Sequence, residues 1–175
     1  MFENICTDLA RLGDQNELCI RNIIRGVLSP GFQAILVYRF FRWFCLRKIP
    51  TQPLRFFFER FIEITTGISI PVACEIGKGL RIHHFGGIIF HPTAKTGEYC
   101  TIYHGVTIGD KGGYGGAARI GNNVLIGAGA KIVGEITIGN DCRIGANAVV
   151  NKDVPDKSIV FGNPCVINPA NRDLK

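Results

Sequence analysis

Histidine is the residue type in this chain best suited to moving a proton at neutral pH. The sequence holds four histidines in its middle third: His83, His84, His91 and His104. His84 and His104 share an offset, because they stand two positions after Ile82 and Ile102. A neutral imidazole is a natural base for taking a proton from a hydroxyl group. The shared offset favours a common catalytic site over separate surface roles.

His83 and His84 cannot both face the same groove. They are neighbours on an expected strand, and successive side chains of a strand point to opposite faces. His84 is the one that leads into an expected corner at Gly86 and Gly87. We therefore expect the geometry of the repeat to decide which imidazole enters a site.

A six-residue repeat must position these histidines. Isoleucine or valine recurs at every sixth position: Ile120, Ile126, Ile132, Ile138, Ile144 and Val150. Glycine follows four of the six. This period fits neither a helix nor an ordinary strand, so it indicates a structural repeat. The repeat extends back to Ile70, with slips, and Ile82, Ile88 and Ile102 belong to it.

Each repeat unit supplies a short strand with an inward aliphatic side chain and a tight corner. Three units close one triangular coil, and stacked coils pair as parallel strands. The sequence therefore predicts a parallel β-helix over residues 67–164, with a helical region at 1–66 and a tail at 165–175. Residues 109–119 are too rich in glycine to pack as strands, so they are expected to form an extruded loop.

The helical region is aromatic and basic. Residues 32–60 hold six basic residues and one acid among many aromatics, and they predict helices at 32–47 and 53–65. Two weaker helical patterns cover 4–12 and 17–28. One interpretation is a surface that contacts a membrane or a lipid-linked substrate. The other is that the aromatics cap the β-helix or pack between subunits, with the arginines pointing to solvent.

Composition limits the number of domains, the cellular location and the kinds of ligand that we expect for this protein. The chain has 175 residues, 46% of them hydrophobic, which suffices for one core without a second globular domain. The N-terminus lacks a signal sequence, and the seven cysteines form no CxxC pair. We therefore expect a cytoplasmic protein with reduced thiols and no metal site. Aromatics at helical spacing without a known module argue against nucleic-acid binding.

Two long strings carry a resemblance to a known family. They are GLRIHHFGGIIFHPTAKTGEYCTIYHGVTIGD and ARIGNNVLIGAGAKIVGEITIGNDCRIGANAVVNKDVPDKSIVFGNP. They resemble the acetyl-CoA-dependent hexapeptide-repeat acyltransferases, in the serine acetyltransferase-like branch. The short aromatic N-terminal segment and the IHH and HGVTIG strings are most similar to colanic-acid and capsule-type O-acetyltransferases. The resemblance implies a left-handed β-helix, an exception to the right-handed crossover rule.

The resemblance also implies an assembly and a catalytic mechanism. The family forms homotrimers that bind acetyl-CoA between neighbouring prisms, and whether two trimers pair is left open. His84 falls on the general base, which deprotonates the acceptor hydroxyl for direct attack on the thioester. His104 matches a histidine that faces the reaction centre across the subunit interface.

Other positions match the acetyl-CoA groove of the family. Ala128, Gly129 and Ala146 would line the pantetheine tunnel, because small residues allow close approach to the backbone. Asn151 and Lys152 would lie near the nucleotide end, where a lysine can meet phosphates.

Departures from serine acetyltransferases bear on the acceptor. Where that family carries aspartate, this chain has His83 before the base and Ser69 upstream, so Glu75 or a residue of the adjacent subunit would have to orient His84. The Arg-His pair that ends the loop in that family is absent at 116–119.

The loop itself carries Asp110, Lys111 and Tyr114, and Tyr114 could stack on a sugar ring. His83, Asp110 and Tyr114 are therefore the candidate substrate contacts. Together these features favour a larger, neutral, polyhydroxylated acceptor.

These features lead to one main expectation and two alternatives. The main one is an acetyl-CoA-dependent O-acetyltransferase acting on a sugar hydroxyl in capsule or exopolysaccharide biosynthesis. Its aromatic and basic helices would keep it near the inner membrane face, where a lipid-linked saccharide acceptor would be built. The first alternative is serine O-acetyltransferase of cysteine biosynthesis. The second is a non-catalytic scaffold, or a trimer with zinc between subunits held by His83, His84 and His104.

Overall fold

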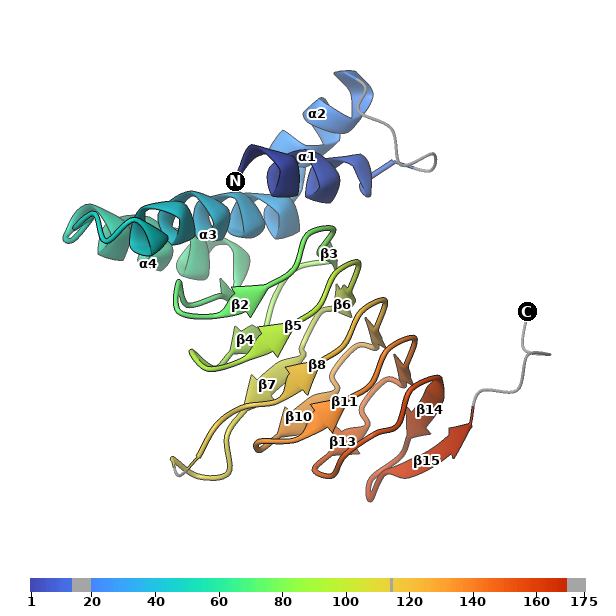
Figure 1. The fold of residues 1–175 in the computed structure, drawn as a ribbon. Helices are drawn as coiled ribbons and strands as arrows, with labels where there is room; N and C mark the ends of the chain where they lie inside the picture. Colours follow the sequence, from blue (N-terminus) through green and yellow to red (C-terminus); the bar gives the residue numbers. More distant parts are fainter. Residues whose placement is uncertain (14–19, 114, 170–175) are drawn as a thin grey trace.

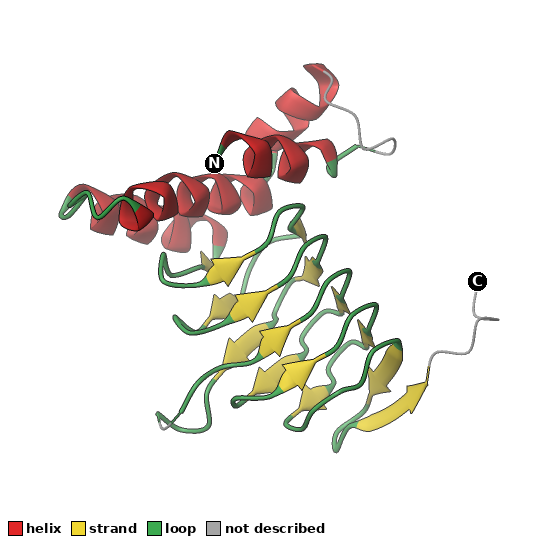
Figure 2. Cartoon of the chain, viewed as in Figure 1, coloured by secondary structure: helices red, strands yellow, loops and turns green. Residues whose placement is uncertain are grey.

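The chain forms a stack of triangular coils with helices over one end (Figure 1). The computed structural model describes residues 1–13, 20–113 and 115–169. The helices are α1 (Phe2–Ala10), α2 (Ile20–Leu28), α3 (Pro30–Leu46) and α4 (Leu54–Thr66). Their separation from the strands is plain in Figure 2.

The strands form three sheets, one for each side of the triangle. The first sheet holds β1 (Ile68–Ser69), β4 (Ile88–Phe90), β7 (Thr107–Gly109), β10 (Lys131–Val133) and β13 (Val149–Val150). The second holds β2 (Glu75–Ile76), β5 (Lys95–Thr96), β8 (Arg119–Ile120) and β11 (Thr137–Ile138). The third holds β3 (Arg81–His83), β6 (Thr101–Tyr103), β9 (Leu125–Ile126), β12 (Arg143–Ile144), β14 (Ser158–Phe161) and β15 (Val166–Pro169).

The chain visits the three sheets in turn, so each strand pairs with the one a full coil later. These pairs are parallel except at the end, where β15 turns back antiparallel on β14. The predicted parallel β-helix of hexapeptide repeats with an α-helical N-terminal region is confirmed.

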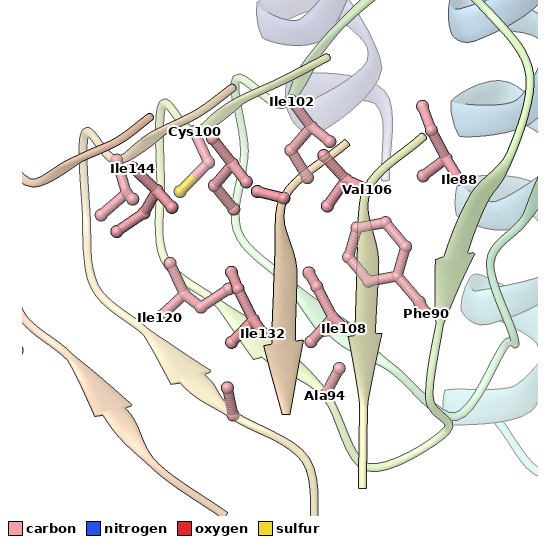
Figure 3. Close-up of a cluster of buried hydrophobic side chains, with 14 of the residues drawn as sticks. Ile88, Phe90, Ala94, Cys100, Ile102, Val106, Ile108, Ile120, Ile132 and Ile144 are labelled. Atoms are coloured by element: carbon pink, nitrogen blue, oxygen red, sulfur yellow. The ribbon is translucent and has the colours of Figure 1, made fainter. Parts of the chain in front are cut away.

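Aliphatic ladders fill the inside of the coils. In the third sheet Ile82, Ile102, Ile126 and Ile144 pair in register, and the last three are fully buried. Burying each such side chain stabilises the fold by about 1.5–3 kcal/mol. Figure 3 shows how side chains from different coils meet in this core. One ladder position of the second sheet holds Thr96, whose buried Oγ1 has no hydrogen-bond partner among the described residues.

The slip in the repeat lies one corner earlier than the sequence suggested. Spacing placed Ile88 in the aliphatic ladder, but Phe90 is the residue in register with Ile108. Ile88 instead fills the position two residues earlier, as Val106 does in the next coil, and both are fully buried. The two extra residues therefore widen the corner immediately after His84.

The glycine-rich segment leaves the prism between β7 and β8 (Figure 1). Its return is held where the Ala117 N–H donates to Thr93 Oγ1 at 2.9 Å. On its outgoing side, Lys111 lies against Gly134 of the next coil.

Helix α3 covers the open end of the stack. It starts at a Ser29 cap followed by Pro30, a residue pre-set for the first helical turn. Its Tyr38 hydroxyl donates to the Cys74 carbonyl at 2.8 Å, and Phe32, Ile35 and Phe41 are buried. Helix α4 ends at Gly67, whose φ of 64° suits glycine. The expected aromatic cap is present in α3.

The expectation that the arginines point to solvent is wrong for Arg39. Its side chain is 4% exposed and pairs with the fully buried Asp8 of α1 at 2.9 Å. It also donates to the carbonyls of Ile76 and Gly77, both at 2.6 Å. A buried guanidinium with these partners cannot serve a membrane surface.

The two weaker helical patterns correspond to α1 and α2. The first residues of the second pattern, 17–19, lie outside the described part of the chain. None of the helices in the described residues is long and apolar enough to cross a membrane.

Candidate active site

Candidate site residues from four successive coils line up at one corner of the prism. The register of the third sheet pairs Ile82, Ile102, Ile126 and Ile144 in turn. At the carboxyl ends of these strands His104, Ala128 and Ala146 form a column. In the first coil the widened corner places Gly86 in this column, since the Gly105 N–H donates to the Gly86 carbonyl, and His84 lies beside His104. Gly129 lies beside this column, where its N–H donates to the His104 carbonyl at 2.8 Å. We call residues 84–87, 104–105, 128–129 and 146–147 the histidine corner.

The imidazoles of His84 and His104 lie edge to face. Their ring centroids are 5.8 Å apart with an interplanar angle of 76°. Both side chains are exposed on the single chain. His84 takes a φ of 61°, a left-handed conformation that is uncommon for residues other than glycine. The widened corner therefore begins with a residue in the left-handed region.

Glycines keep the backbones of this corner close together. Gly87, Gly105 and Gly129 all have positive φ, and a Cβ on Gly105 would come within 3.3 Å of the Gly129 Cα. Lys131 secures the turn after His104, because its ammonium donates to the Gly105 carbonyl and to Thr107 Oγ1. The two rings thus stand on a corner whose backbone has little room to move.

The His83 ring lies beside that of His84, with ring centroids 6.3 Å apart. His83 lies at the end of β3, where its ring stacks on Tyr103 at 4.8 Å and 9°. Burial, and then the positive charge of Arg81, lower the pKa of His83 below its ordinary value. The stacked His83 ring is therefore held in its neutral form at neutral pH.

Three other candidates lie at a second corner, after the first sheet. Asp110 follows β7, and Asn151 and Lys152 follow β13. The extruded segment 110–118 leaves from the same corner, which we call the loop corner. Tyr114 lies outside the described residues. A strand advances about 3.3 Å per residue, so β7 keeps His104 and Asp110 roughly 15–20 Å apart within one chain.

Glu75 does not orient His84, which corrects that expectation. It lies on the second sheet, where its carboxylate accepts from Lys95 Nζ at 2.8 Å. Within the described part of the chain, no carboxylate forms a hydrogen bond with His84 or His104. The same residues contain no group of three His, Cys, Asp or Glu that could hold a metal ion.

Sequence reasoning missed two residues beside the histidines. Tyr103 stacks on His83, and Lys131 holds the turn after His104. The signal for Tyr103 was present, because Tyr103 follows Ile102 as His83 follows Ile82. No pattern pointed to Lys131, since its bond depends on which coils are neighbours.

Comparison with known proteins places this geometry in a family. Residues 117–152 match the model described as "Bacterial transferase hexapeptide (six repeats)". Serine acetyltransferase from Synechococcus elongatus is 36% identical over 167 residues, covering 94% of this chain and 67% of that protein. The Helicobacter pylori enzyme of that name is 39% identical over 145 residues, covering 78% and 80%. The chain belongs to the serine acetyltransferase family.

Solved structures of serine acetyltransferases have the same fold as this chain. Serine acetyltransferase from Brucella abortus in complex with coenzyme A superposes with a TM-score of 0.85 at 30% identity, covering 96% of this chain and 67% of that one. The Neisseria gonorrhoeae enzyme in complex with serine gives 0.83 at 32%, covering 94% and 68%. This likeness confirms the predicted left-handed β-helix acyltransferase fold. The chain spans about two thirds of the length of both solved enzymes.

The comparisons also correct the expected acceptor. The similarity that suggested capsule-type O-acetyltransferases predicted a sugar hydroxyl and a lipid-linked saccharide. The relatives found over most of the chain are serine acetyltransferases instead. The prediction of an enzyme of surface-polysaccharide biosynthesis is therefore wrong, and its first alternative agrees better with the relatives.

Proposed function

We propose that this protein is a serine O-acetyltransferase that transfers the acetyl group of acetyl-CoA to the hydroxyl of L-serine. The observation that carries the proposal is the pair of imidazoles, His84 and His104, whose ring centroids lie 5.8 Å apart at a corner lined by small residues. The family relationship supports the donor and the acceptor, because its members include enzymes crystallised with coenzyme A and with serine.

In the proposed mechanism His84 acts as the base. Its imidazole takes the proton from the serine hydroxyl as the oxygen attacks the thioester carbonyl. The carbon–sulfur bond then breaks, and the leaving thiolate receives the proton from the imidazolium. His104 lies close enough to orient the thioester or the hydroxyl. General-base catalysis of this kind contributes about 100- to 10,000-fold in rate.

Small residues at the same corner suit the pantetheine arm. A flexible amide-bearing chain can approach the backbone only where side chains are absent or short. Ala128, Gly129 and Ala146 provide such a strip beside the histidines. Lys152 at the loop corner offers a positive charge to the phosphates.

The separation of the two corners supports a trimer. A donor that touches both sets of residues cannot do so within one chain without wrapping around a side of the prism. Two prisms packed side by side bring the histidine corner of one next to the loop corner of another. We therefore propose that the complete site forms between subunits of a homotrimer.

Serine recognition differs from the family pattern at two positions. The chain carries Ser69 and His83 where the family resemblance leads us to expect aspartates. Arg81 points to the same face of β3 as His83 and can offer a positive charge to the serine carboxylate. We propose that Arg81 contributes to serine binding, so that Arg81→Gln raises the KM for serine with little effect on kcat.

A thiol-release assay with acetyl-CoA tests the proposed function. The wild-type protein should release CoA in the presence of L-serine and not in its absence. His84→Ala should lower kcat by about 100- to 10,000-fold. Lys157→Ala is the control, because Lys157 is exposed and precedes β14, at the third corner of the prism, which carries neither set of site residues. Failure of L-serine to stimulate release would refute the proposal, as would equal losses in the two variants.

A further inference from the structure

Helix α4 presents an apolar face to solvent. Leu54, Phe57, Phe61 and Ile64 recur at spacings of three and four, so they lie along one side of the helix. Each is between 55% and 74% exposed. Phe58, at the border of this face, is 46% exposed. The side of α4 that is buried carries Ile62 and Thr66 instead. An amphipathic helix packed in this orientation leaves its larger apolar face free.

This face continues onto α3 through aromatic contacts. Phe58 lies 5.9 Å from Phe41 between ring centroids, and Phe41 lies 5.2 Å from Phe40. The series goes on through Phe44 to Trp43, with centroids 5.0 and 4.8 Å apart. The series passes through Phe41, which is buried between the helices, so the exposed rings of α3 and α4 are joined in one aromatic cluster.

The border of this cluster is basic. Residues 42–66 contain five arginines and lysines and two glutamates. Both glutamates are already engaged, Glu59 with Arg55 and Glu63 with Arg60. Arg47 stacks on the Trp43 ring at 3.9 Å, and Arg47 and Lys48 are exposed. Neither forms an ion pair within the described residues, so their positive charge is free to act outward.

We propose that this aromatic–basic surface docks on an anionic phospholipid bilayer. We define it as the exposed apolar residues of α4 together with Phe40, Trp43, Arg47 and Lys48. Aromatic and aliphatic side chains enter the boundary between headgroups and acyl chains. Arginine and lysine beside them attract anionic headgroups, with about 1 kcal/mol for each basic residue near the surface.

The unpaired charges favour a lipid surface over a two-fold contact between copies of the chain. In a two-fold contact the same patch meets itself, so Arg47 and Lys48 of both copies would share one interface. Like charges brought together in this way destabilise a contact. An anionic bilayer offers both an apolar layer and the opposite charge. The proposal is independent of the acetyl transfer, because the surface lies on the helices and not at either corner of the site.

Vesicle co-sedimentation tests the charge contribution. The full chain is mixed with vesicles of phosphatidylcholine alone or with phosphatidylglycerol added. We expect binding only to the anionic vesicles and weaker binding at high salt. Arg47→Gln/Lys48→Gln should lower the affinity about 30-fold, from the loss of two basic residues. Arg143→Gln/Lys157→Gln removes the same charge from the prism and should bind like the wild type. Lys48 and Lys157 are matched in backbone, with φ of 56° and 55°.

A second pair of variants tests the apolar contribution. Phe57→Ser/Phe61→Ser should abolish binding, whereas Phe161→Ser/Val166→Ser should not. The control residues are 46% and 48% exposed and lie on β14 and β15, at the far end of the prism (Figure 1). Circular dichroism confirms that each variant is folded.

Three results would overturn the proposal. The first is no binding of the wild-type chain to anionic vesicles. The second is equal binding by the charge variant and its matched control. The third is a fall in solution mass for Phe57→Ser/Phe61→Ser, measured by light scattering, which would show that a second copy covers this surface.

Discussion

Loss of the Asp8 carboxylate should strongly destabilise the protein. Asp8 is fully buried in α1 and accepts from Arg39 Nε at 2.9 Å and from Arg39 Nη2 at 3.3 Å. It also accepts from the Leu80 N–H at 2.9 Å. Asp8→Ala leaves a buried guanidinium without its counter-charge and a buried amide without its acceptor. These contacts join the first helix to the first coil.

The magnitude follows from burial. Removing one partner of a buried ion pair costs about 3–5 kcal/mol, because the other charge stays behind. That is a large part of the roughly 5–15 kcal/mol by which a domain is stable. For a chain of this size each kcal/mol shifts Tm by about 2–4 °C, so a fall of about 6–20 °C is expected.

Glu3 provides the matched control on the same helix. It also pairs with the prism, through Lys78 at 2.9 Å, but its side chain is 75% exposed. Glu3→Ala should leave the urea midpoint unchanged within error, because exposed pairs contribute little. Asp8→Ala/Arg39→Met should recover part of the loss, since no buried charge remains. The measurement is urea and thermal unfolding followed by circular dichroism. Equal midpoints for Glu3→Ala and Asp8→Ala would refute the reasoning.

Three further predictions concern pH, packing and thiols. Burial raises the pKa of Tyr38 to about 12. Because the folded protein keeps the Tyr38 proton that the unfolded chain loses near pH 10, stability should fall between about pH 10 and 12. Tyr38→Phe should flatten this part of the alkaline unfolding profile. Gly127→Ala should cost about 1–3 kcal/mol in urea unfolding, because its Cβ would lie 2.6 Å from a backbone nitrogen of the next coil. Gly109→Ala has no neighbour within 3.8 Å and should cost little. Ellman's reagent should modify the exposed Cys45 quickly at pH 8 and Cys74 only on unfolding, because burial raises the pKa of Cys74 to about 12.

The β-helix could be predicted because its determinants repeat. An aliphatic residue at most sixth positions and an apolar residue two positions earlier specify the coils, as Ile126 and Val124 illustrate. The shared offset of His84 and His104 likewise became a shared corner, because the register is set by the same aliphatic ladder. Local sequence patterns were therefore sufficient to predict both the fold and the two candidate imidazoles.

Features that depend on non-repeating contacts could not be predicted. Arg39 looked like a surface charge, because its partner Asp8 lies in another helix. Ile88 and Phe90 are both apolar, so spacing alone could not decide which one continued the ladder. The acceptor was misjudged because the absence of charged residues at 69, 83 and 116–117 was taken as a sign of a neutral substrate. In the proposed trimer, the groups that would bind serine depend on contacts between subunits.

The antiparallel strand β15 limits the addition of further coils to the β-helix. Parallel coils present the same backbone edge at each end, and such an edge can accept another chain. Here α3 packs over the first coil, and β15 runs antiparallel to the other strands of its sheet. An incoming coil would meet a mismatched ladder of amides and carbonyls at that side. Helix α3 and strand β15 thus disfavour the end-to-end stacking of molecules into fibres.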